Sequence, residues 1–259
     1  MSYSGFTLDV NTVLRRVNHV ANDQGFTVSP LTEQNGLIVP VLTRKSRMPD
    51  GPSIYLSTGI HGDEPGGPAA VLHLLENGAL TQKVGWTIFP MLNPAGFELN
   101  QRENHQSIDL NREYLNPETK EIVDHVNYIA DQRGWDLALI LHEDWESEGF
   151  YLYDLPQDLT VGWSERIIDR VSEHCPIDLT SEIDDMNATG GIISPKLDSV
   201  NRNRKLQGKW PETVFMIEKR KVHGTFTFEA PSVFDLQSRI SALETATLTA
   251  VELLLSNKT

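Results

Sequence analysis

A histidine and a glutamate three residues apart follow one apolar run of the sequence. His61 and Glu64 come directly after SIYLSTGI, the run that begins at Ser53. An imidazole and a carboxylate on such a turn can bind one zinc ion, and a catalytic zinc needs a third protein ligand and an open position for water. His142 ends another apolar run, LALILH. The spacing therefore predicts that His61, Glu64 and His142 hold one Zn²⁺ ion, although a lone His-x-x-Glu pair also fits ordinary structural residues.

A second carboxylate interrupts an apolar run near the end of the chain. Glu229 lies within TFTFEA, where a buried charge is costly unless it is paired or used. A carboxylate in such surroundings has a raised pKa, which is the property that a general base near neutral pH requires. We therefore predict that Glu229 is the catalytic base, with a structural ion pair as the alternative.

These residues need elements that bring them together. Apolar, β-prone runs recur along the chain: LIVPVLT, SIYLSTGI, WTIFPML, LALILH, FYLYDL, TVFMIEK and TFTFEA. Helical patterns lie at residues 10–23, 66–80, 117–133, 162–174 and 235–255. This alternation predicts an α/β fold, with a twisted, largely parallel mixed sheet and helices on both faces. Such sheets carry their chemistry beyond the carboxyl ends of the strands, where His61, Glu64 and His142 are expected.

No repeat or long linker divides the sequence, so we predict a single catalytic domain over residues 1–259. The stretch from Ile177 to Trp210 is rich in Asp, Asn, Ser and Gly. We expect it to be a long excursion that borders the site, because long loops in compact domains are often functional.

The composition limits the partners and the compartment. A formal net charge of -14 disfavours binding to nucleic acid or to an anionic membrane. The first residues lack the basic start and apolar run of a secretory signal, and the lone Cys175 allows no internal disulfide. We therefore expect a cytoplasmic protein whose partner is a small substrate. The sequence does not predict an oligomeric state.

Several motifs in fixed order resemble the zinc carboxypeptidase superfamily, which includes the succinylglutamate desuccinylase and aspartoacylase group. They extend from about Ser53 to Ser232 and are His-Gly-Asp-Glu at 61–64, Asn-Pro-Ala-Gly at 93–96, Arg-Glu-Asn at 102–104, Asp-Leu-Asn-Arg at 109–112, His142, and Phe-Thr-Phe-Glu at 226–229. The combination is far more specific than any single motif. The resemblance implies the fold of that superfamily and a zinc-dependent hydrolysis of amide bonds.

The resemblance also implies a role for individual residues. His61, Glu64 and His142 match the zinc ligands, and Glu229 matches the general base that later donates the proton. Arg102 matches the arginine that polarises the scissile carbonyl. Asn111 and Arg112 match the pair that binds the free carboxylate of the substrate, for which a guanidinium is well shaped. Asp109 matches a carboxylate that orients a zinc-binding histidine.

The sequence departs from the digestive carboxypeptidases at one position. These enzymes carry a mobile tyrosine before the catalytic glutamate, but no tyrosine lies between Tyr153 and Glu229. Trp210 and His223 are the alternatives for a residue that covers the substrate. The resemblance therefore does not imply the substrate specificity of the digestive carboxypeptidases for this chain.

Other polar residues have weaker assignments. The carboxylates at 143, 144, 146 and 148 follow His142 and are expected in a solvated loop, with a role beside the site as the alternative. His105 could line the site or be exposed. The basic cluster of Arg202, Arg204 and Lys205 is expected to be solvated, although an acidic substrate could use it.

Three functions fit this sequence. The first is a carboxypeptidase-like metallopeptidase that cuts an amide bond next to a free carboxylate. The second is a deacylase of N-acyl amino acids, in which Arg112 would bind the same carboxylate. The third is a catalytically silent metal- or peptide-binding protein, which would need neither Glu229 nor Arg102. Substrate side-chain preference and the choice of zinc over another divalent ion are not predicted.

Overall fold

One eight-stranded sheet runs through the part of the chain that the computed structural model describes, which is residues 7–155, 161–196 and 209–257. Its strands are β1 (Thr27–Gln34), β2 (Leu37–Arg44), β3 (Ser53–Thr58), β4 (Gly85–Phe89), β5 (Leu137–Asp144), β6 (Tyr151–Leu155), β9 (Ile192–Ile193) and β10 (Thr225–Pro231). Across the sheet they follow the order β1-β2-β4-β3-β5-β10-β6-β9.

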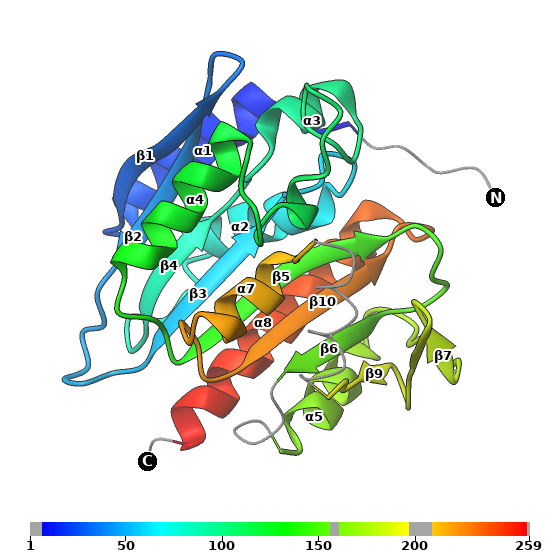
Figure 1. Cartoon of the computed structure of the whole chain (residues 1–259). Coiled ribbons are helices and arrows are strands. Elements are labelled where there is room, and N and C mark those ends of the chain that lie inside the picture. The colour runs from blue at the N-terminus through cyan, green and yellow to red at the C-terminus, as the bar shows by residue number, and fades with distance from the viewer. Residues whose placement is uncertain (1–6, 156–160, 197–208, 258–259) are drawn as a thin grey trace.

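The centre of this sheet is parallel and its margins are mixed. Strands β4, β3, β5 and β10 run in one direction, whereas β2 is antiparallel to β4 and β6 is antiparallel to β10. Helices cover both faces (Figure 1). The expected largely parallel mixed α/β fold with helices on both faces is therefore confirmed.

Alternation along the central strands builds a separate core on each face. In β3, Ile54 and Leu56 pack into one core and Tyr55 into the other, because successive side chains of a strand point to opposite faces. The first core is covered by α1 (Val10–Asp23), α2 (Gly66–Glu76), α5 (Trp163–Val171) and α8 (Leu236–Asn257). The second is covered by α4 (Lys120–Asp131) and α7 (Glu212–Glu218), which lie in front of the sheet in Figure 1.

The predicted helices all form, but one predicted strand is wrong. The run TVFMIEK folds as the helix α7. Residues 212–217 are all buried, so the run carries no periodicity that separates a buried helix from a buried strand. Pro211 directly before it suits a helix start, since proline provides a suitable backbone angle and needs no hydrogen-bond partner for an N–H.

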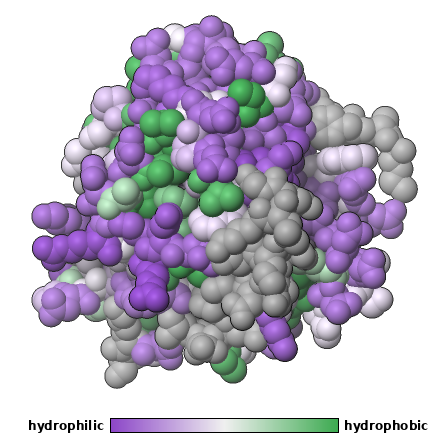
Figure 2. All heavy atoms as spheres, viewed as in Figure 1, coloured by the Kyte–Doolittle hydropathy of each residue, from purple (hydrophilic) through white to green (hydrophobic). Residues whose placement is uncertain are grey.

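Several elements were not predicted, including β1, α3 (Pro94–Leu99), the strands β7 (Glu182–Ile183) and β8 (Met186–Asn187), and the short strand β9. Strand β1 contains Pro30 and is mostly polar, as suits a sheet edge. Helix α3 follows the Asn93 cap, and a two-stranded hairpin joins β7 to β8. The face of the molecule in Figure 2 is mainly hydrophilic, with a few hydrophobic patches. Among the helices of the described ranges, none combines the length and the hydropathy that crossing a membrane requires.

Candidate metal centre and active site

The carboxyl ends of three neighbouring parallel strands bring distant residues to one edge of the sheet. Thr58 at the end of β3 pairs with Leu141 in β5, and His142 in β5 pairs with Glu229 in β10. His61 and Glu64 lie in the turn that follows β3. The predicted convergence at this edge is therefore present in the structure.

Close backbone packing shapes the turn that carries His61 and Glu64. A Cβ atom on Gly62 would lie 2.1 Å from the carbonyl carbon of Gly96, so only glycine fits there. The Asn93 side chain accepts a hydrogen bond from the Gly96 N–H at 3.0 Å and donates to the carbonyl of Ile60 at 3.1 Å. The Asn-Pro-Ala-Gly motif therefore fixes the turn after β3 against the start of α3.

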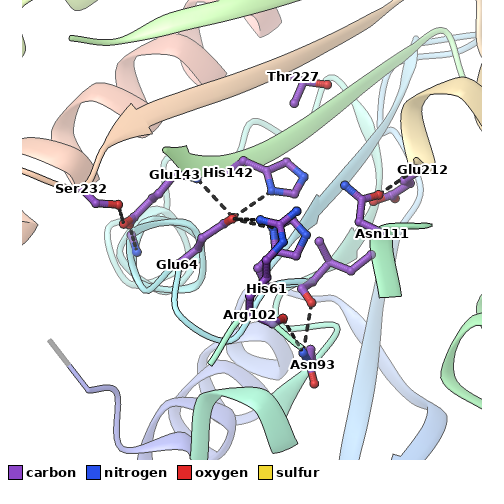
Figure 3. Close-up of polar contacts among 12 residues, drawn as sticks. His61, Glu64, Asn93, Arg102, Asn111, His142, Glu143, Glu212, Thr227 and Ser232 are labelled. Atoms are coloured by element: carbon purple, nitrogen blue, oxygen red, sulfur yellow. Dashed lines mark hydrogen bonds and ion pairs between the residues drawn. The ribbon is translucent and has the colours of Figure 1, made fainter. Parts of the chain in front are cut away.

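His61, Glu64 and His142 form one buried group that could hold a metal ion. Their ligand atoms all lie within 4.8 Å of one another. Glu64 Oε1 lies 2.5 Å from His61 Nδ1 and Oε2 lies 2.8 Å from His142 Nδ1. Dashed lines mark contacts of Glu64 in Figure 3. Burial alone would raise the pKa of Glu64, but His61 and His142 together hold it below its ordinary value. Two imidazoles and an ionised carboxylate are a donor set that suits a catalytic divalent ion such as zinc.

The second nitrogen of His61 faces a carboxylate. Asp109 Oδ1 lies 3.3 Å from His61 Nε2, and Asp109 Oδ2 accepts a hydrogen bond from Arg102 Nε at 2.9 Å. A carboxylate on the outer nitrogen fixes the orientation of a metal-binding imidazole. The geometry thus fits the expected role of Asp109. The ligand atoms of His61, Glu64 and His142 also fit a metal ion.

Two arginines and an asparagine lie along the same cavity as the His-Glu-His group. Arg102 Nη1 is 3.3 Å from His61 Nδ1 and 3.7 Å from Glu64 Oε1. Asn111 and Arg112 lie in the 3-10 turn η1 (Leu110–Arg112), which Asp109 caps by accepting the Asn111 N–H. Arg112 Nη1 donates to the Asn111 carbonyl at 2.9 Å. The cavity lining therefore contains two guanidinium groups close to the His-Glu-His group.

Glu229 lines this cavity beside the group. Its desolvation by the surrounding protein raises its pKa to about 8, an effect that His142 opposes and Glu64 reinforces. Tyr151, its register partner in β6, and Tyr153 also line the cavity. Tyr151 and Tyr153 are two residues apart in FYLYDL, and this spacing places both side chains on one face of a strand. Neither tyrosine was predicted to line the site.

The cavity has a volume of about 1010 Å³, at the upper end of the range typical for ligand sites. The β7–β8 hairpin and the residues before it form part of its wall, so the described part of the excursion borders the site as expected. On the opposite side of the metal-ligand group from Asn111 lie Glu143 and Ser232 (Figure 3). Trp145, an exposed residue, also lines the cavity.

Glu143 contradicts the expected solvated loop. Its side chain is fully buried and forms an ion pair with Arg239 of α8. It also accepts hydrogen bonds from the Gly66 N–H and, at 3.2 Å, from Ser232 Oγ. Its own N–H donates to Glu64 Oε2 at 3.2 Å. Glu143 therefore joins the start of α2, the end of β10 and α8 behind the candidate metal ligands.

Other expected positions lie away from the cavity. Trp210 is buried in the core on the α7 face, and His223 precedes the amino end of β10, so neither lines the cavity beside Glu229. His105 is exposed and is not part of the lining. Cys175 is buried. The basic cluster at Arg202, Arg204 and Lys205 lies outside the described residues.

Comparisons with known proteins agree with this architecture. Residues 50–152, fewer than half of the chain, match the succinylglutamate desuccinylase/aspartoacylase catalytic domain family. This range includes His61, Glu64 and His142 but not Glu229. Carboxypeptidase SOL1 of Arabidopsis thaliana is 26% identical over 188 residues, which are 61% of this chain but only 38% of that relative.

Solved structures share the fold at low sequence identity. A candidate metallopeptidase from Shewanella amazonensis SB2B superposes with a TM-score of 0.81 at 22% identity, covering 95% of this chain and 93% of its own. A metallo-carboxypeptidase from Pseudomonas aeruginosa, in complex with (2-guanidinoethylmercapto)succinic acid, has a TM-score of 0.63 at 18% identity and covers 93% and 68%. The family match and the curated relative are thus similarities to the zinc carboxypeptidase-like superfamily, and the solved structures share its fold.

Proposed function

We propose that this chain is a zinc-dependent, carboxypeptidase-like hydrolase that cuts an amide bond next to a free carboxylate. The observation that carries the proposal is one cavity lined by a buried His-Glu-His group, by Glu229 and by two arginines, Arg102 and Arg112. A single Zn²⁺ ion held by His61, Glu64 and His142 would lower the pKa of water and polarise the scissile carbonyl. Residues 1–259 would then form one catalytic domain, and a cytoplasmic location stays a prediction.

Glu229 and Arg102 carry the chemistry in this proposal. Glu229 takes a proton from the attacking water and later donates it to the leaving nitrogen, so its raised pKa suits both steps. Arg102 stabilises the negative charge that develops on the carbonyl oxygen, because its guanidinium stands beside His61 and Glu64 while Asp109 holds its Nε.

Asn111 and Arg112 bind the free carboxylate of the substrate. A guanidinium and an amide nitrogen supply the hydrogen-bond donors that a carboxylate needs. The Pseudomonas aeruginosa metallo-carboxypeptidase binds a succinic acid derivative, which supports a carboxylate-bearing ligand on this fold.

Two substrate classes remain, with separate support. A cavity of about 1010 Å³ that continues past the metal-ligand group to Trp145 favours a peptide. The match to the desuccinylase and aspartoacylase family favours an N-acyl amino acid instead. The peptide is the leading candidate because the cavity exceeds the needs of a small acyl group. A catalytically silent binding protein would gain nothing from Glu229 and Arg102.

A substrate panel tests the proposal. Purified zinc-loaded protein is incubated with short peptides that carry a free or an amidated C-terminus, and with N-acetyl and N-succinyl amino acids. We expect release of the C-terminal residue from the free peptides and at least tenfold lower kcat/KM for their amides, since a lost charged hydrogen bond costs about 1.5–3 kcal/mol. Hydrolysis confined to N-acyl amino acids would establish the deacylase instead. No hydrolysis of either class would contradict the proposed function.

A further inference from the structure

Four buried polar side chains form a hydrogen-bonded network behind the residues assigned to the substrate carboxylate. Tyr55 OH in β3 donates to Glu212 Oε1 at the start of α7 and lies 2.8 Å from Nε2 of His125 in α4. The other ring nitrogen of His125 lies 2.9 Å from Tyr114 OH. All four residues are buried. The network therefore joins β3, α4, α7 and the segment that follows Arg112.

This network reaches Asn111 through the backbone of Glu212. The Glu212 N–H donates to Asn111 Oδ1 at 2.9 Å, and Figure 3 shows the two residues side by side. Because an N–H requires an acceptor, the amide oxygen of Asn111 is the atom that points toward α7. The amide nitrogen, a donor, is then the atom left for a ligand in the cavity that Asn111 lines. This orientation is the one that a carboxylate requires.

A second connection holds the same segment from its other end. Tyr114 lies two residues after Arg112, and its N–H donates to the Trp210 carbonyl at 3.2 Å. Its hydroxyl belongs to the network through His125. The 3-10 turn that carries Asn111 and Arg112 is thus fixed against the start of α7 at both of its ends.

The chemistry of the network is unusual for a core. Glu212 is a buried carboxylate, and within residues 7–155, 161–196 and 209–257 no ion pair with Lys or Arg compensates it. Burial lowers the pKa of His125 to about 3, so this imidazole is neutral and supplies no positive charge. An apolar side chain would fill the same volume at lower cost. A buried carboxylate at this point therefore favours a positional role over simple packing.

We infer that Tyr55 and Glu212 are positioning residues for the substrate's free carboxylate, acting through Asn111. The inference rests on the proposed function, since it assigns the carboxylate to Asn111. Tyr55 holds the Glu212 side chain, this fixes the start of α7, and the Glu212 N–H then sets the amide orientation of Asn111.

The test separates binding from chemistry. In Tyr55→Phe we expect KM for a free-carboxylate peptide to rise about three- to tenfold, as for the loss of one buried hydrogen bond, while kcat stays within about twofold. Glu212→Gln keeps an oxygen that accepts from Tyr55 and should retain the wild-type KM. Tyr128→Phe is the matched control, because it removes a half-buried hydroxyl from α4 that takes no part in the network. Thermal melting and zinc content are measured for each variant.

Two results would overturn the inference. The first is an unchanged KM in a folded, zinc-loaded Tyr55→Phe. The second is a fall in kcat alone that follows a loss of folded protein, which would show a purely structural role. If the wild type itself hydrolysed no substrate of either class, the proposed function would fail and this inference with it. An active wild type together with an unchanged KM in Tyr55→Phe would contradict only the positioning role of Tyr55 and Glu212.

Discussion

Replacing Glu229 by glutamine should reduce kcat by about 10²- to 10⁴-fold while the protein keeps its metal, because a positioned general base contributes about that much to the rate. The carboxylate lines the cavity beside His142, its register partner, but it is not part of the His61–Glu64–His142 group. Glutamine has the same shape and cannot accept the proton. The effect is measured as steady-state kcat on the best substrate of the panel, alongside the zinc content.

Glu173→Gln is the control for this substitution. Glu173 is exposed just after α5 and does not line the cavity, so the same chemical change should leave kcat within about twofold. Activity of Glu229→Gln equal to that of the wild type would end the mechanism proposed for Glu229. Loss of zinc in Glu229→Gln would show instead that Glu229 is a metal ligand.

Removing Arg239 should destabilise the fold by up to about 3–5 kcal/mol at about pH 8, the usual cost of leaving a buried charge without its partner. Arg239→Ala removes the guanidinium that faces Glu143, and both side chains of this pair are buried. The free energy of unfolding is measured by urea titration. Because Glu143 also contacts Gly66 and the Glu64 carboxylate, we expect weaker zinc binding in this variant as well.

The loss of stability in Arg239→Ala should increase with pH. Burial raises the pKa of Glu143 to about 7 from an ordinary 4.5, and Arg239 opposes that rise. Without Arg239 the pKa of the Glu143 carboxyl rises further. At low pH this carboxyl is protonated and its burial costs little, whereas at higher pH its ionised form lies buried without a partner and destabilises the fold. The destabilisation should therefore be larger at about pH 8 than at about pH 5.5.

Arg170→Ala provides the comparison for the Arg239 variant. Arg170 and Glu252 form an ion pair at 3.5 Å whose side chains are 56% and 68% exposed. Its removal should cost less than about 1 kcal/mol at either pH. Equal losses of unfolding free energy in Arg239→Ala and Arg170→Ala would contradict a stabilising role for the buried Glu143–Arg239 pair.

The meeting of His61, Glu64 and His142 could be predicted because it follows from topology alone. Parallel neighbouring strands end at the same edge of a sheet, so residues just beyond apolar runs are brought together whatever their distance in sequence. Glu229 was identified instead as a carboxylate that interrupts an apolar run, and its position beside His142 became visible only in the structure. Asn93 was identified only as part of a motif, and its contacts with Gly96 and Ile60 became visible in the structure.

The Glu143–Arg239 ion pair and the network around Glu212 could not be predicted, because both depend on contacts between segments far apart in the chain. Glu143 looked like part of a solvated charge run because its partner, Arg239, lies 96 residues away. The network around Glu212 was hidden for the same reason, and also because α7 was expected to be a strand. His125 was expected on a helix, but its sequence context does not reveal the two tyrosines that contact it.

The central claim is that His61, Glu64 and His142 hold one catalytic metal ion. Elemental analysis of the purified, zinc-loaded protein after removal of free metal tests it most directly. We expect close to one zinc per chain in the wild type and in Glu229→Gln, and essentially none in a folded His61→Ala. A His61→Ala protein that retains stoichiometric zinc, or a folded wild type that binds none, would contradict it.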